Sequence, residues 1–240
     1  NWGAFCSIRD LEHGHFWSTS HQPTLQEPKN YEAVFSQGRA EFRRRDVSIE
    51  THTEIVISPE DDIEMRRVHI TNRSRRRRWL DVTSYAEVVL APAAADNMHP
   101  AFSKLFIQTE VLEHKYAILC TRRPRSKDEQ TPWLFHLMTA TGGTIQEVSY
   151  ETDRMKFIGR GNTVANPCAM TMSEALSGSQ GSVLDPVVAI RYKVLLEPEE
   201  TITIDMIMGV TETREASQAL IEKYQDKHHK DRVLELAWTH

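Results

Sequence analysis

Hydrophobic and polar positions alternate with a period of two along several stretches of the chain. Residues 47–57, 80–88, 188–196 and 202–208 each carry apolar, small or β-branched side chains at every second position. This spacing predicts β-strands with one buried and one solvated face. After residue 213 the apolar positions follow helical spacing, which predicts helix in the tail. Because no helical pattern separates the strands, we expect packed antiparallel sheets.

The stretch 63–88 predicts a long hairpin. Two apolar runs, 63–70 and 80–88, are separated by Asn72-Arg73-Ser74, which are typical turn residues. The apolar phase slips by one residue at Arg66–Arg67, as a β-bulge would require. We therefore expect the two runs to pair with each other. We also expect the odd positions of the second run, Asp81, Thr83, Tyr85 and Glu87, to face solvent.

Composition limits the partners and the compartment. The 240 residues include 29 Lys+Arg and 34 Asp+Glu, for a formal net charge of -5. Because the chain as a whole is acidic, we interpret the basic run Arg75–Arg78 as a solvated turn. We therefore expect no nucleic-acid partner. Apolar runs fall short of the roughly 20 residues that span a bilayer, so we expect no membrane contact. Three widely spaced cysteines favour a reducing compartment, and we expect a cytoplasmic protein.

The tail gives one expectation about chain length. Apolar helical spacing continues through residues 233–238, where the sequence stops. A helix cut at this point would leave its apolar face without a partner. We therefore expect a fragment of a longer protein.

The opening corner holds candidate sugar contacts. Trp17 could stack on a sugar ring while Arg9 and Asp10 bond its hydroxyl groups. The alternative is a Trp packed in the core beneath a hairpin, and spacing alone favours neither. The nearby histidines 13, 15 and 21 lack a spaced carboxylate or thiol that would complete a metal site, so we expect no metal.

No catalytic constellation emerges from the sequence. The paired carboxylates Asp61-Asp62 and Glu199-Glu200 fall in turns, where solvated surface is the better interpretation. A nucleophile elbow is absent. The segment 90–106, which contains Pro92 and Pro100, is longer than a hairpin loop should be, and long loops are often functional.

Four segments carry a resemblance to a known family: 8–18 (IRDLEHGHFWS), 58–106, 150–167 and 181–198. They resemble the N-terminal domain of glycoside hydrolase family 94, the inverting glycoside phosphorylases. Within that family the chain is similar to the phosphorylase-like region of cyclic β-1,2-glucan synthases. The resemblance covers essentially the whole chain.

The resemblance implies a fold and a division of the chain. Residues 1–213 would form an all-β, antiparallel β-supersandwich of the galactose-mutarotase-like kind. Residues 214–240 would begin a helical linker to an (α/α)₆ barrel. In the family, an Asp general acid and inorganic phosphate perform phosphorolysis, and both belong to the barrel. No catalytic residue is therefore carried over, and no cofactor is expected for this chain.

The resemblance also implies a role and a set of candidate residues. We expect a non-catalytic, carbohydrate-binding or scaffolding domain of a larger enzyme, and the resemblance leaves open that this enzyme is anchored in a bacterial inner membrane. Its partners would be a β-glucan or gluco-oligosaccharide and its own barrel domain, and a homodimer is left open. The alternatives are a purely structural module for dimerisation or domain contact, and a sandwich with its own mutarotase-like activity. The motif-matching residues are Arg9, Asp10, Trp17, Asp153, Arg154 and Arg160, which would touch sugar or brace a domain interface.

Overall fold

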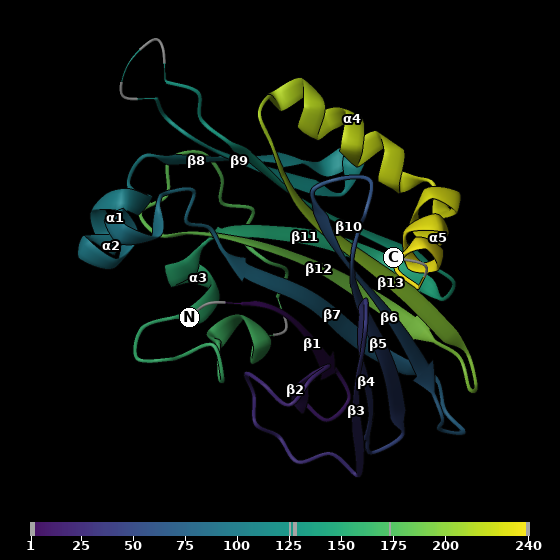
Figure 1. Cartoon of the computed structure of the whole chain (residues 1–240). Coiled ribbons are helices and arrows are strands. Elements are labelled where there is room, and N and C mark those ends of the chain that lie inside the picture. The colour runs from purple at the N-terminus through teal and green to yellow at the C-terminus, as the bar shows by residue number, and fades with distance from the viewer. Residues whose placement is uncertain (1–2, 125, 127–128, 173, 239–240) are drawn as a thin grey trace.

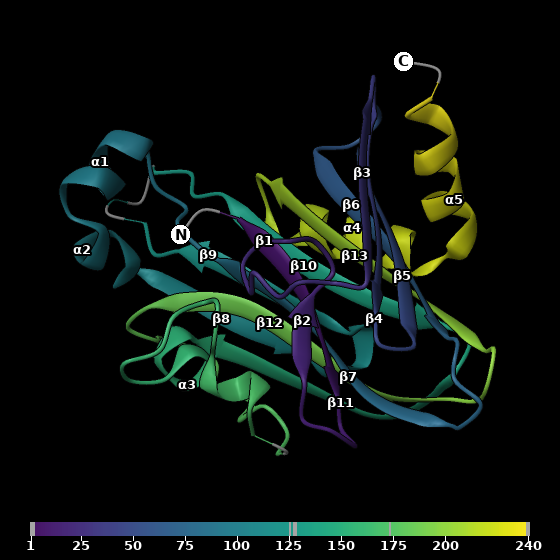
Figure 2. The ribbon, with the colours of Figure 1, turned by 90° about the horizontal axis from the view of Figure 1, so that it is seen from below.

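The computed structural model describes residues 3–124, 126, 129–172 and 174–238, and the strands of this part form two antiparallel sheets. The five-stranded sheet has the order β11 (Thr144–Asp153), β12 (Pro186–Leu196), β7 (Arg78–Glu87), β1 (Ala4–Asp10), β2 (Phe16–Ser18). The eight-stranded sheet has the order β3 (Asn30–Ser36), β4 (Arg39–Asp46), β5 (Ile49–Ile57), β6 (Ile63–Asn72), β13 (Thr201–Thr211), β10 (Trp133–Thr141), β9 (Ala117–Arg122), β8 (Ile107–Leu112). The sheets stack face to face (Figures 1 and 2), which confirms the predicted sandwich.

The alternating segments are strands, as predicted. They correspond to β5, β7, β12 and β13. The opening residues form a tight hairpin, in which Arg9 of β1 pairs with Phe16 of β2. Gly14 in its turn has a φ of 72°, a conformation that favours glycine.

The predicted hairpin of residues 63–88 is wrong. β6 pairs with β5 and β13, whereas β7 pairs with β1 and β12, so the two strands belong to different sheets. Residues Asn72–Ser74 instead begin the turn by which the chain crosses from the eight-stranded sheet to the five-stranded sheet. Asn72 is fully buried at this crossing, and its amide holds the chain in place.

The predicted bulge at Arg66–Arg67 is also wrong. β6 keeps a continuous register with both neighbours through these residues. The apolar phase slips because the buried side of the strand changes. Met65 packs in an outer core against the C-terminal helices, while Val68 and Ile70 pack between the sheets.

β7 differs from the expected strand with one solvated face. Its even positions fill the core between the sheets, as predicted. Its odd positions 81, 83 and 85 are buried as well. The reason is that helix α3 (Arg154–Ile158) and a segment that contains η2 (Cys168–Met170) cover the outer face of the five-stranded sheet (Figure 2). Asp81 and Thr83 are each only 1% exposed.

The helices lie outside the two sheets (Figures 1 and 2). The long segment 90–106 forms two short helices, α1 (Ala93–Met98) and α2 (Pro100–Lys104), and η1 (Glu113–Lys115) connects β8 to β9. The tail forms α4 (Arg214–Gln225) and α5 (Lys227–Leu236), while residues 239–240 lie outside the described part. None of the described helices is long and apolar enough to cross a membrane.

The apolar side of the tail has a partner within this chain, contrary to the expectation. Ile221, Tyr224 and Val233 are almost fully buried against the outer face of the eight-stranded sheet. This sheet therefore has apolar cores on both of its faces. The division of the chain at residue 213 stays a prediction.

Candidate functional site

Arg9 from the opening motif holds the segment that covers the five-stranded sheet. Its guanidinium donates from Nη1 to the carbonyl oxygen of Met172 and from Nη2 to that of Thr171, the latter at 3.1 Å. The side chain is buried, at 6% exposed. These contacts are structural, and a sugar contact by Arg9 stays a prediction.

A row of buried charges continues from Arg9 across the outer face of this sheet. Arg9 pairs in register with Asp81 of β7, and Asp81 lies 4.0 Å from Nη1 of Arg191 in β12. Arg191 donates to the carbonyls of Ala169 (2.7 Å) and Glu174 (3.2 Å). Burial raises the pKa of the Asp81 carboxyl. The row attaches the covering segment to the sheet and leaves no opening for a substrate at Arg191, which is 3% exposed.

Asp10, which is buried, forms a small cluster with the exposed side chains of Glu12 and His13. Their ligand atoms lie within 4.8 Å of one another, which would allow a metal ion. However, Nη1 of Arg78 lies 2.7 Å from Glu12 and 3.4 Å from Asp10. The Arg78 guanidinium already places a positive charge beside both carboxylates, which disfavours a metal ion at this position.

Trp17 is a core residue. It is 4% exposed and packs in the apolar cluster between the sheets. Stacking on a sugar requires an accessible ring face, so the structure decides for the core alternative. Its position opposite Ile8 in the hairpin turns the ring toward the second sheet.

The later motif lies around the end of β7. Asp153 caps α3 by accepting a hydrogen bond from the amide of Met155 at 2.9 Å. Arg154 donates from Nε to Glu87 at 3.0 Å. Arg160 is exposed. Substrate binding by these three residues stays a prediction.

The two motifs do not converge on one site. Arg9 lies beside Asp81, whereas Arg154 contacts Glu87, six residues further along β7. At about 3.3 Å per residue, the two contacts are roughly 20 Å apart.

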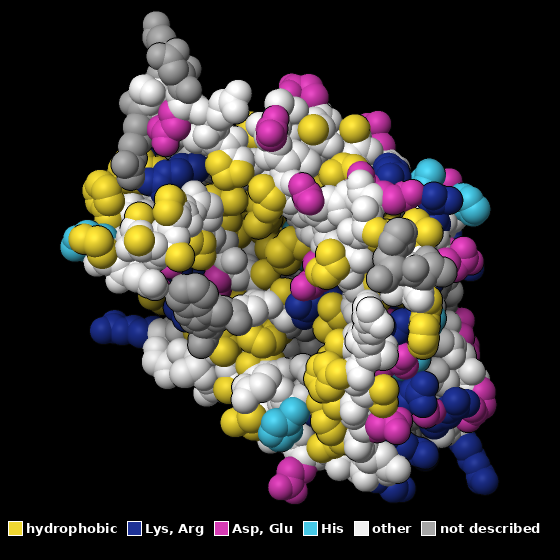
Figure 3. Space-filling view, in the orientation of Figure 1, with side chains coloured by type: hydrophobic (Ala, Val, Ile, Leu, Met, Phe, Trp, Pro, Cys, Tyr) yellow, Lys and Arg dark blue, Asp and Glu magenta, His cyan; other side chains and the backbone are white. Residues whose placement is uncertain are grey.

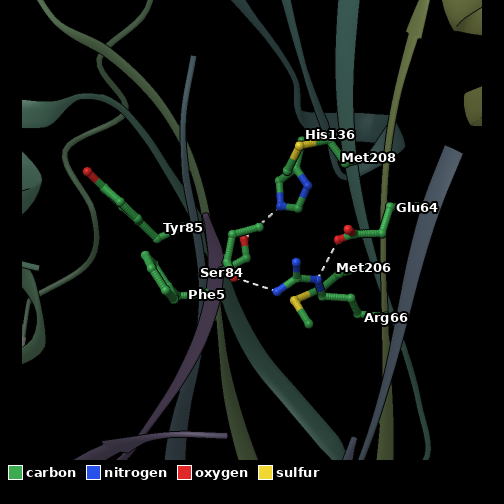
Figure 4. A pocket seen from close by; sticks show the side chains of 9 residues that line it. Phe5, Glu64, Arg66, Ser84, Tyr85, His136, Met206 and Met208 are labelled. Carbon is green, nitrogen blue, oxygen red and sulfur yellow. Dashed lines mark hydrogen bonds and ion pairs between the residues drawn. The ribbon is translucent and has the colours of Figure 1, made fainter. Parts of the chain in front are cut away.

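A Ser–His pair lies between the sheets at the base of a small cavity (Figure 4). Ser84 Oγ is 2.8 Å from Nε2 of His136. Glu64 and Arg66, both on β6, form an ion pair in one wall of the cavity. Burial lowers the pKa of His136 to about 4, so the imidazole is neutral near pH 7. The cavity holds about 10 Å³, enough for roughly one water molecule. The pair therefore lacks room for a substrate, and Ser84 also accepts a hydrogen bond from the amide of Ile190.

A larger hollow lies beside α1 and α2, and none of its lining residues was identified as a site residue from the sequence. We call it the α1–α2 pocket; it has a volume of about 530 Å³, and its lining comprises Gly3, Glu87, Val89, Asp96, Asn97, Pro100 and Lys104. The only sequence signal was the unusual length of the segment 90–106. Lys104 of this segment and Arg154 both contact Glu87, so the fold brings the segment and Arg154 together at the end of β7.

Apolar side chains also remain at the surface. Figure 3 shows them around the hollow between the part formed by α1 and α2 and the part formed by β3 and β4. At the end of the eight-stranded sheet, an apolar groove of about 470 Å³ is lined by residues that include Phe35, Ile57 and Ala237. Phe35 is 74% exposed and Ile57 is 62% exposed. Exposed apolar patches of this kind are typical of interaction surfaces.

The described residues therefore form two stacked antiparallel sheets with helices outside them. The family model of the glycosyl hydrolase 94 supersandwich domain matches residues 1–227. This chain belongs to that family.

Three curated relatives extend this result. The chain is 32% identical over 237 residues to the cyclic β-(1,2)-glucan synthase NdvB of Rhizobium meliloti, covering 99% of this chain and 8% of that protein. It is 22% identical to the solabiose phosphorylase of Paenibacillus borealis, covering 90% of this chain and 27% of that protein. It is 26% identical to the N,N'-diacetylchitobiose phosphorylase of Vibrio furnissii, with 93% and 27% covered. The chain thus spans between about a twelfth and about a quarter of the length of these relatives.

Proposed function

We propose that this chain is a non-catalytic domain of a larger enzyme that processes β-1,2-glucan, and that it binds the glucan weakly while it supports a catalytic domain. The observation that carries the proposal is the match to the supersandwich domain together with the similarity to a cyclic β-(1,2)-glucan synthase. The two phosphorylase relatives favour a partner domain that performs phosphorolysis with inorganic phosphate. The proposed compartment is the cytoplasm, as the cysteine usage suggests.

The geometry of the site supports a non-catalytic role. Ser84 and His136 are enclosed, and the charges around Arg9 and Arg191 are used to attach the covering segment. General acid–base catalysis requires a group within hydrogen-bond reach of the reacting atom. Of the described residues, neither the buried Ser84–His136 pair nor the row formed by Arg9, Asp81 and Arg191 is open enough for a sugar to come within hydrogen-bond distance.

The scaffolding part of the proposal rests on the exposed apolar groove that contains Phe35 and Ile57. We propose that the groove contacts the enzyme's own barrel domain, because burial of such surface stabilises a domain contact. A homodimer contact through the same groove is the second candidate, and it would make the domain a structural module.

Titration and activity assays on the 240-residue chain test the proposal. We expect β-1,2-gluco-oligosaccharides to bind with a dissociation constant of roughly a millimolar, and cellotriose, the linkage control, to bind more weakly. With inorganic phosphate present, we expect no release of glucose 1-phosphate. Accelerated anomer exchange of glucose would instead establish a mutarotase-like activity, and glucose 1-phosphate release would overturn the non-catalytic assignment.

A further inference from the structure

Asp96 is a buried carboxylate with an unsatisfied oxygen. It lies in α1, is 6% exposed, and lines the α1–α2 pocket. Among the described residues, its Oδ1 atom has no hydrogen-bond partner. Buried carboxylate oxygens in folded proteins normally have a partner, because burial removes their hydration. The missing partner in a pocket wall points to a ligand that donates hydrogen bonds.

Two other charged residues that line the pocket, Glu87 and Lys104, are held in place by neighbouring side chains. Glu87 accepts from Arg154 Nε at 3.0 Å and from the Tyr85 hydroxyl at 3.2 Å. The Lys104 ammonium lies 2.8 Å from Asp185 and 3.7 Å from Glu87. These contacts fix both groups before any ligand binds, which reduces the entropy lost on binding.

The chemistry of the lining selects a class of ligand. Asp96 and Glu87 supply carboxylate acceptors, and the Asn97 amide can both donate and accept. Two carboxylates disfavour an anion, and the ammonium of Lys104 disfavours a bare cation. Val89 and Pro100 add apolar contacts for C–H groups. A neutral ligand with neighbouring hydroxyl groups satisfies all of these features, and about 530 Å³ lies within the usual range for small-ligand pockets.

We infer that the α1–α2 pocket binds a glucosyl unit of the glucan, with two adjacent hydroxyl groups donating to Asp96. The inference rests on the proposed glucan binding and assigns it to one place. It also gives Arg154 a positioning role, since Arg154 orients Glu87 in the pocket wall.

Titration of β-1,2-linked glucotriose into wild type and variants, followed by backbone and side-chain amide NMR, tests this site. In wild type we expect shifts at Gly3 and at the Asn97 side chain. Asp96→Asn removes the charge at constant size and should weaken binding about tenfold or more. Asn97→Ala should weaken it several-fold. Glu212→Gln, a substitution on the exposed surface, is the matched control and should leave binding unchanged.

The melting temperature of each variant separates a ligand site from a structural carboxylate. Since Asp96 Oδ1 has no partner, Asp96→Asn should leave the melting temperature unchanged or raise it. A marked fall would assign Asp96 a structural role and overturn the inference. Unchanged binding by Asp96→Asn would place the sugar elsewhere and leave the proposed function standing. Absence of binding by wild type would refute glucan binding itself and this site with it.

Discussion

Nδ2 of Asn72 lies 3.1 Å from the carbonyl oxygen of Leu196 and donates a hydrogen bond to it. Asn72 ends β6 in the eight-stranded sheet, and Leu196 ends β12 in the five-stranded sheet. The same amide nitrogen also contacts the carbonyls of Arg76 and Glu197. One fully buried side chain thus joins the ends of strands from both sheets at the crossing.

Asn72→Ala should destabilise the protein by about 2–4 kcal/mol, because it leaves several buried carbonyl groups without a donor. Asn30→Ala is the control, since Asn30 lies exposed on the edge strand β3 and its loss should change stability by less than about 0.5 kcal/mol. The free energy of unfolding in urea measures both. Equal effects of the two substitutions would contradict the role given to Asn72.

Asp205→Ala should destabilise the protein by about 3–5 kcal/mol. Asp205 is 2% exposed, and its carboxylate lies 2.6 Å from Arg67 and 3.1 Å from Lys230 of α5. Removal leaves two buried cations without this partner. Asp231→Ala is a matched control: Asp231 also contacts Arg67, at 2.7 Å, but its side chain is 37% exposed. It should cost about 1 kcal/mol or less.

Hydrogen exchange provides the second readout for this network. Asp205→Ala should speed exchange of the α5 amides more than of the β7 amides, because Lys230 anchors α5 to the sheet. Uniform acceleration throughout the chain would show that the network does not hold α5 specifically.

Trp17→Ala should destabilise the protein by about 3–5 kcal/mol, the usual cost of removing a core aromatic ring. Trp238→Ala provides the comparison, since that ring is 65% exposed and contacts Arg39 at the surface. Its removal should cost about 1 kcal/mol or less. Thermal melts of both variants test the difference. A wild-type melting temperature for Trp17→Ala would return this ring to the list of candidate sugar contacts.

Stability should fall as the pH decreases from about 6.5 to 4. Burial lowers the pKa of His136 in the folded state to about 4, whereas in the unfolded chain it lies near 6.5. Below pH 6.5 the unfolded state binds a proton that the folded state does not, which favours unfolding. The loss should amount to a few kcal/mol at most. Above pH 6.5 the full contribution is present.

Urea unfolding at several pH values measures this dependence. His136→Phe should flatten the decline between pH 6.5 and 4, whatever its effect on stability at pH 7. The exposed His114 serves as the control, and His114→Gln should leave the decline as in wild type. A decline that persists unchanged in His136→Phe would assign it to other groups.

The candidate site was only partly predictable. The motifs that contain Arg9, Asp10 and Arg154 were recognisable in the sequence, but their contacts were not. Arg9 bonds carbonyl groups more than 160 positions away, and Arg154 contacts Glu87, 67 positions away. The only sign in the sequence of the pocket that contains Asp96 was the length of segment 90–106. The pocket itself could not be predicted, because its walls come from segments that are distant in sequence.

The sequence by itself determined the strands with alternating side chains and the helices of the tail. β12, β13 and the helices of the tail follow from side-chain periodicity, which depends on backbone geometry between near neighbours. Tertiary structure decided which strands pair and which faces are covered. It placed β6 and β7 in different sheets, and it buried Asp81 beneath residues that lie about 90 positions further along the chain. Local periodicity carries no information about such distant partners, because burial on the second face of a strand depends on what packs there.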